Sequence, residues 1–196
     1  MEHPDALLDR IRAVDPQHAE TMGRQPTTFA AEPLRFYRRH TLVTASVHLP
    51  HDTLVLRYAD DGTAPVPLGE PSAVYRVNDA EALGLAQGDV ADYVRFFLAS
   101  TRGRDGRDRQ LVETPADVLW LRASAEDPAM SVVRAEASSR IHPLAVFASV
   151  SGYRVVALVV EEQRLLELTL AVNGTGRVRE EGARVVAEDL PLALAI

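Results

Sequence analysis

The chain contains no cysteine and no lysine, and all 21 of its Lys and Arg positions are arginine. Without a thiol, the protein has no cysteine nucleophile, no thiolate metal site and no iron–sulfur cluster. Without a side-chain amine, it cannot hold a carbonyl substrate as a Schiff base or form the phosphate loop that ends in Gly-Lys-Ser/Thr. These two absences exclude several large classes of enzyme.

Long apolar runs are missing as well. No stretch approaches the roughly 18 consecutive apolar residues of a membrane-spanning helix, and the residues after Met1 lack the basic start and apolar run of an export signal. We therefore expect a cytoplasmic protein with no membrane association. The formal net charge of −7 opposes non-specific attraction to nucleic acid. Arginine without lysine is typical of a GC-rich bacterial genome.

The size and composition fit a folded protein. A chain of 196 residues, 46% hydrophobic and 25% charged, is long enough to bury a continuous core. Helical and strand patterns are both present, so we expect an α+β fold. The simplest organisation is one domain over residues 1–196, and the alternative is a subdivision into residues 1–113 and 114–196.

The first part of the chain changes from helical to strand periodicity. Apolar residues between 34 and 59 alternate with polar ones, which predicts two antiparallel strands joined by a short turn. In chain order, we expect a helix over 4–14, a connecting segment over 17–33, strands over 41–49 and 54–58, a strand over 73–77 and a helix start at Asn78.

The helix expected over residues 89–100 has the clearest pattern in the sequence. Its apolar residues recur with helical spacing and form a broad stripe that should lie on a sheet. Phe96 falls outside this stripe, so it either widens the buried face or contacts a second surface. The stripe consists of Val90, Tyr93, Val94, Phe97 and Leu98.

The C-terminal third has an almost wholly β pattern and predicts an antiparallel meander packed against a few helices, chiefly residues 89–100. Asn173-Gly174 is the strongest hairpin signal. The strand over 153–161 is apolar on both faces, so other elements or a second subunit must cover both. A short strand over 110–113 and a helix start at Thr114 precede this region. The expected later strands are 131–137, 144–150, 153–161, 164–172 and 177–187.

Three polar residues around one turn are candidate metal ligands. His48 and His51 flank the turn after the first strand, and Asp52 follows directly. Two imidazoles and a carboxylate are a ligand set that zinc or iron accepts. Ordinary turn composition produces the same pattern, so the metal site is a hypothesis that needs spatial convergence.

Two arginine groups are candidate anion sites. The first is interleaved with aromatic residues and the second with glycines and aspartates. Guanidinium groups suit phosphates and carboxylates, but the aspartates of the second group favour internal ion pairs. The first group is Arg35, Arg38 and Arg39, and the second is Arg102, Arg104 and Arg107, with Arg109 after it.

No motif specifies a reaction, and we expect no cofactor. Adjacent acids such as Asp60-Asp61 are typical of hydrated turns. We expect a non-catalytic accessory protein that acts through contacts with a protein partner or a second copy of itself, with Phe96 as a candidate interface residue. One alternative is a small hydrolase or metal-dependent enzyme that uses His48, His51 and Asp52. A weaker alternative is anion or nucleic-acid binding through the arginines.

Overall fold

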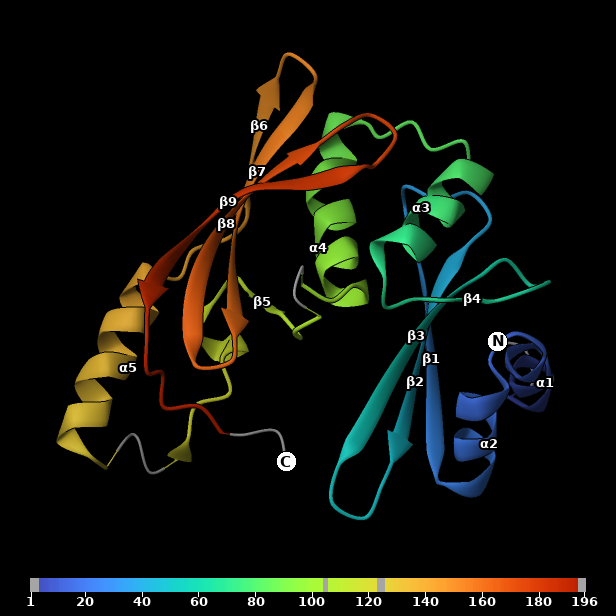
Figure 1. Ribbon diagram of the computed structural model, residues 1–196, viewed down its shortest axis with the longest axis horizontal. Helices are drawn as coiled ribbons and strands as arrows, with labels where there is room; N and C mark the ends of the chain where they lie inside the picture. The colour runs from blue at the N-terminus through green and yellow to red at the C-terminus, as the bar shows by residue number, and fades with distance from the viewer. Residues whose placement is uncertain (1–3, 104–105, 123–125, 194–196) are drawn as a thin grey trace. The chain divides into compact units, whose positions relative to one another are not determined.

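The computed structural model describes residues 4–103, 106–122 and 126–193. The fold is α+β with two antiparallel sheets, which confirms the expected fold class (Figure 1). The chain forms two compact units, of which the first ends at Leu83 and the second begins at Gly84. The subdivision considered from the sequence lay after Glu113 instead. Strand β5 (Gln110–Val112) pairs with β7 (Gly152–Glu161), so it belongs to the second unit.

The first unit is a four-stranded sheet with three helices, and its strand order is β1-β2-β3-β4. The predicted helix over 4–14 and the predicted strand pair are confirmed. Its elements are α1 (Pro4–Val14), α2 (Pro16–Arg24), β1 (Thr27–Pro33), β2 (Thr41–His48), β3 (Thr53–Asp60), β4 (Val66–Pro67) and α3 (Pro71–Ala80).

The expectation of a connecting segment over 17–33 is wrong, because this stretch contains α2 and β1. Asp15 caps α2 by accepting a bond from the backbone N–H of His18, and Pro16 occupies the first turn. The helix buries only Ala19 and Met22, which is too little for a clear apolar period. β1 is an edge strand that is largely exposed, so its sequence also lacks strong alternation.

The core of the first unit lies between one face of the sheet and helices α1 and α2. Leu7 and Ile11 lie one helical turn apart on α1 and pack in the same cluster as Val43, Ala45 and Val47 of β2. These β2 residues alternate with half-buried ones, as a one-sided sheet requires. The cluster also contains Ala19, Met22 and Tyr58.

The strand expected over 73–77 is also wrong, because α3 covers this stretch and includes Asn78. Its buried residues Ala73, Val74 and Val77 recur with helical rather than strand spacing. Asn78 lies in the last turn of α3 and does not begin a helix. Its side-chain oxygen accepts a hydrogen bond from the Tyr37 hydroxyl at 2.5 Å.

The second unit contains the predicted meander. Strands β5-β7-β8-β9 lie in that order, and β6 pairs with β7 beyond the end of β5. Its elements are η1 (Gln87–Asp89), α4 (Val90–Ser100), β5, η2 (Pro115–Asp117), α5 (Pro128–Arg140), β6 (Ala145–Ser149), β7, β8 (Arg164–Val172) and β9 (Val178–Ala187).

β7 is the central strand, as its sequence predicts, and both of its faces are buried. On one face, Leu158 and Val160 pack in a cluster with Ala137 of α5 and with Leu190 near the end of the described chain. On the other face, Val155 and Ala157 are fully buried. The first face is therefore covered from within the same unit, by α5 and the C-terminal segment. Helix α4 contacts β5 and β6, and its predicted stripe is buried.

The strand expected over 131–137 is wrong, because these residues belong to α5. Asp127 caps this helix by accepting bonds from the N–H groups of Ala129 and Met130. The β-branched pair Val132-Val133 favours a strand by intrinsic propensity, but the cap and Pro128 begin a helix. Val132 points outward on this helix and is 66% exposed.

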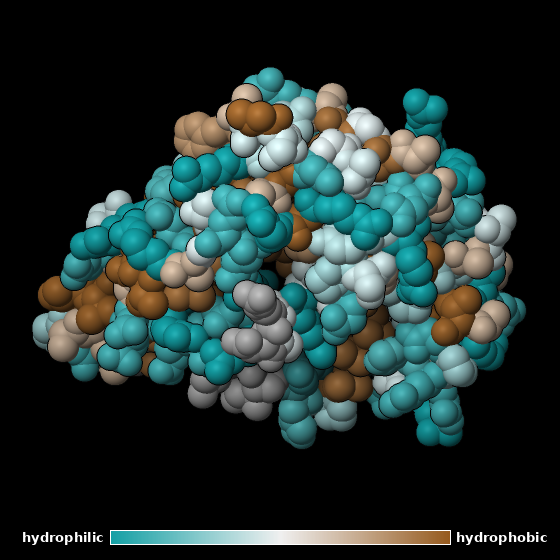
Figure 2. Space-filling view, turned by 45° about the horizontal axis from the view of Figure 1, so that its top comes forward, coloured by the Kyte–Doolittle hydropathy of each residue, from teal (hydrophilic) through white to brown (hydrophobic). Residues whose placement is uncertain are grey.

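The exterior is mostly hydrophilic, with hydrophobic residues at the surface in several places (Figure 2). Among the described residues, the large hydrophobic side chains with the highest exposure include Leu119, Val132, Phe147 and Val150. No helix in this part of the chain is both long and apolar enough to cross a membrane.

Candidate functional site

A cavity of about 370 Å³ opens in the first unit, between the N-terminal part of α1 and the sheet. Much of its wall is apolar, with Leu7 from α1, Phe29 and Ala31 from β1, and Val43 from β2. The register places Ala31 beside Val43 on the helix-covered face of the sheet. An open, largely apolar cavity therefore lies beside the hydrophobic core of this unit.

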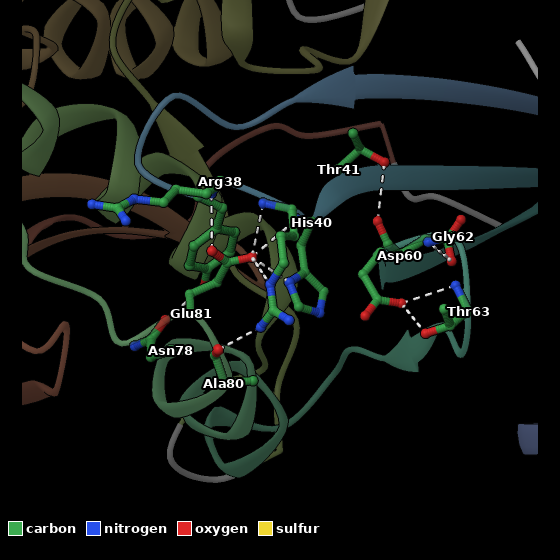
Figure 3. A network of polar contacts seen from close by, with 12 residues as sticks. Arg38, His40, Thr41, Asp60, Gly62, Thr63, Asn78, Ala80 and Glu81 are labelled. Atoms are coloured by element: carbon green, nitrogen blue, oxygen red, sulfur yellow. Dashed lines mark hydrogen bonds and ion pairs between the residues drawn. The ribbon is translucent and has the colours of Figure 1, made fainter.

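Polar groups gather where β2 begins and β3 ends. Thr41 pairs with Asp60 in the antiparallel register, and both line the cavity together with Asp61 and Gly62. The Thr41 hydroxyl donates to the backbone oxygen of Asp60 at 3.3 Å, and the Gly62 N–H donates to the Asp60 carboxylate at 3.2 Å (Figure 3). The cavity thus has an apolar body and one polar end.

Asp60 is buried and carries its own counter-charge. The Arg10 guanidinium of α1 donates to the Asp60 carboxylate at 2.7 Å, and the side chains are 17% and 10% exposed. Loss of one partner from a pair this shielded from water leaves the other charge buried and uncompensated, which costs more than breaking a surface ion pair. The pair fixes α1 over the end of β3.

Asp61 also lines the cavity, and its carboxylate is held by the turn that follows it. Its Oδ1 accepts bonds from the N–H and the hydroxyl of Thr63 at 3.0 Å and 2.6 Å. A third bond comes from the Ala64 N–H at 3.3 Å. The bonds from Thr63 are the main reason that the pKa of Asp61 falls to about 2. Asp61 is therefore ionised at neutral pH.

A buried carboxylate lies next to this end of the cavity. The side chain of Glu81 is 1% exposed and accepts bonds from the consecutive backbone N–H groups of Arg38, Arg39 and His40 (Figure 3). His40 Nδ1 also lies 2.6 Å from Glu81 Oε1. Burial raises the pKa of Glu81, but the bonds from His40 and the three amides outweigh it and lower the pKa to about 2.

This network shows what the first arginine group binds. The segment predicted to hold an anion does hold one, but the anion is the chain's own Glu81 and the donors are mainly backbone amides. The Arg39 side chain donates to the Ala80 carbonyl at 2.5 Å, and its Nε lies 3.9 Å from Glu81. Arg35 and Arg38 have exposed side chains. Binding of an external anion at this group stays a prediction.

In the second arginine group, the described members form ion pairs within the second unit. Arg107 lies 3.5 Å from Glu161 and 3.2 Å from Glu162, and Arg102 lies 3.3 Å from Asp108. Arg109 bonds both Glu161 and Glu180 at 2.7 Å. These contacts agree with the internal pairing that the interleaved aspartates favour. Arg104 lies outside the described residues.

His48, His51 and Asp52 lie at the β2–β3 turn, and all three are exposed. His48 Nδ1 is 3.4 Å from the Thr53 hydroxyl, and the Asp52 carboxylate accepts a bond from the Thr53 N–H. Across the described residues, no group of three His, Asp or Glu side chains is arranged to hold a metal ion. The metal site stays a prediction without geometric support, and elemental analysis of the purified protein tests it.

Phe96, the predicted interface residue, is only 4% exposed. Its ring lies 6.2 Å from that of Tyr93, centre to centre, on the same helix. The residue therefore widens the buried face of α4, which is the first of the two alternatives that its position allows.

The sequence pattern did not identify the cavity. Asp60-Asp61 has the composition of a hydrated turn, although Asp60 is 8% exposed. One signal was available: the predicted strand pair brings Thr41 at one strand's start beside Asp60 at the other's end, because antiparallel neighbours run in opposite directions. Periodicity predicted helix α1, but it could not predict where α1 packs on the sheet.

Comparison with known proteins finds no matching family model, no similar curated protein and no similar solved structure.

Proposed function

We propose that this chain is a non-catalytic binding protein whose N-terminal unit takes a small, mainly apolar molecule into the cavity beside α1. The cavity itself carries the proposal, since about 370 Å³ of space lies beside the hydrophobic core of this unit. Small-molecule sites are concave, largely apolar and about 300–1,000 Å³ in volume, with a few polar groups that fix orientation. This cavity has all of these properties.

The energetics favour a ligand with an apolar body. Leu7, Phe29 and Val43 present hydrocarbon to the space, so an apolar ligand gains about 0.8 kcal/mol for each methylene that it buries. Protein interiors are close-packed, and the packing contacts that an unfilled site lacks are restored when a ligand enters. No covalent step is part of the proposal.

An NMR titration with 1-octanol tests this function. We expect saturable shifts of the amide signals of Leu7, Ala31 and Val43, and smaller shifts elsewhere. A matched pair of variants locates the site: Ala31→Phe fills the cavity and abolishes binding, whereas Thr28→Phe adds the same ring to the same strand. Thr28 does not line the cavity, so this control keeps binding. Absence of saturable binding, or equal binding by both variants, overturns the proposal.

A second candidate is self-association through β6, which keeps the protein-contact hypothesis of the sequence. β6 pairs with β7 and is not paired on its other edge among the described strands. Its sequence, Ala145–Ser149, has no charge and no proline to block pairing with another strand, and Phe147 is 54% exposed. We propose that a second copy of this chain adds its own β6 to this edge.

Light scattering on a size-exclusion column tests the second candidate. A dimer that becomes monomeric in Phe147→Lys, but not in the control Val132→Lys on α5, supports it. A protein that is monomeric at every concentration contradicts the second candidate.

Cytoplasmic location also remains part of the proposal, and cell fractionation checks it.

A further inference from the structure

We infer that the ligand of the cavity carries a protonated amine at one end, and that this ammonium group is bound by Asp61. The inference rests on the proposed binding function and adds the charge of the ligand to it. The inference depends on the charged side chains at the polar end of the cavity. Some of them already have a partner of opposite charge within the described chain, and Asp61 does not.

Most charges at this end have partners. Asp60 is paired with Arg10 at 2.7 Å. Arg39 lines the cavity, but its guanidinium donates to the carbonyl of Ala80 and lies 3.9 Å from Glu81. Neither Asp60 nor Arg39 therefore offers a charge that needs a counter-ion from the ligand.

Asp61 differs from these groups. Its bonds come from a hydroxyl and two backbone amides, and no cationic side chain in the described chain lies within ion-pair distance of it. The charge of the more distant His40 makes the smallest of the contributions that lower the pKa of Asp61. Those three bonds all go to Oδ1, which leaves Oδ2 without a partner among the described residues. The carboxylate is thus held in place on the cavity wall with one oxygen available to a donor.

An ammonium group fits this arrangement better than a neutral or anionic head group. A charge-assisted hydrogen bond between N⁺–H and a carboxylate is about twice as strong as a neutral one. A carboxylate or phosphate at the same place would face Asp61, the one carboxylate of the cavity lining that no described cationic side chain pairs with, and like charges raise the free energy of the complex. The local charge therefore selects a cationic amphiphile.

Three probes with the same apolar chain test the inference: octylamine, 1-octanol and octanoate, each titrated by calorimetry at pH 7 and low salt. We expect octylamine to bind about tenfold more tightly than 1-octanol, and octanoate to bind most weakly. Asp61→Asn keeps the Oδ1 acceptor of the turn and should remove the advantage of octylamine without changing the affinity for 1-octanol. The control Asp52→Asn removes a carboxylate from the exposed β2–β3 turn and should change neither affinity.

The outcomes separate the inference from the function on which it rests. If 1-octanol binds and octylamine binds no more tightly, the cavity is a ligand site but the assignment of an ammonium group is wrong. An unchanged octylamine preference in Asp61→Asn also overturns it. If none of the three probes binds, the proposed function fails as well. The comparison of probes on the unaltered protein needs no variant to fold.

Discussion

The two units of this protein differ in how completely they fill the space around their sheets. In the second unit, β7 is buried on both faces, and its interior residues Val155, Ala157 and Val159 have no exposed surface. In the first unit, the sheet packs on α1 and α2, but the core stops short of Asp60 and leaves a cavity. We therefore assign the proposed ligand binding to the first unit, which has the cavity.

The units also differ in how they stabilise a buried carboxylate. Glu81 in the first unit is held mainly by backbone amides and His40, whereas Glu161 in the second is held by the guanidinium groups of Arg109, Arg107 and Arg164. Both arrangements lower the pKa of the acid below its usual value. One anion is bound mainly by the backbone of a loop, and the other by side chains from the loop before β5 and from the start of β8.

The largest expected effect is a loss of packing in the filled unit. Leu168 in β8 is fully buried, so Leu168→Ala should lower the free energy of unfolding by about 3 kcal/mol, and up to about 5 if the site does not collapse. The half-buried Leu56 of β3 is the matched residue in the first unit, and Leu56→Ala should cost about 1 kcal/mol. Urea denaturation followed by circular dichroism measures both, and equal losses would contradict the comparison.

The next effect depends on pH and concerns Glu81. Its pKa is about 2 in the folded protein and 4.5 as the ordinary value. Ionised Glu81 therefore contributes about 3 kcal/mol of stability above pH 4.5, which is lost as the pH falls from 4.5 towards 2. Glu81→Gln should be less stable than the unaltered protein at pH 7, and the difference should shrink with acidification. Denaturation curves from pH 7 to pH 3 check this, and a constant difference would show that ionisation is not involved.

The smallest expected effect is a change in stability when a larger side chain is introduced, either into the packed strand β7 or into the wall of the cavity. Ala157→Leu adds bulk to a strand that is already packed and should cost about 2 kcal/mol. Ala31→Phe adds bulk to the cavity wall and should change stability by no more than about 0.5 kcal/mol. Thermal unfolding of the two variants measures the contrast. A similar loss in both would mean that the space beside Ala31 is not available.

The sequence predicted the second unit better than the first, for a physical reason. The strand over 153–161 and its neighbours are long, apolar and bounded by tight turns, so their period is clear. α2 buries only Ala19 and Met22, β1 is an exposed edge, and α3 has a β-branched sequence that its helical spacing overrides. Where the local preference for helix or strand is weak or conflicting, tertiary packing determines the secondary structure. The apolar period of a sequence carries no information about that packing.

The candidate site could be predicted only in fragments. The arginine segment 35–39 indicated an anion site, and the structure supplies an internal anion, Glu81, which caps the C-terminus of α3 and lies 43 residues after Arg38. Asp61 gave no signal, because its proposed role depends on having no described cationic side chain within ion-pair distance, and the fold alone decides that. Partnerships between distant residues such as Arg10 and Asp60 are set by the fold and do not appear as a motif.

The most direct test of the account is a crystal structure of the protein grown with 1-octanol. We predict electron density for the alkyl chain between Leu7, Ala31 and Val43, with its hydroxyl towards the polar end of the cavity. A cavity filled by the chain's own side chains, with the alcohol absent or bound elsewhere, would contradict the claim that the N-terminal unit is a ligand-binding unit.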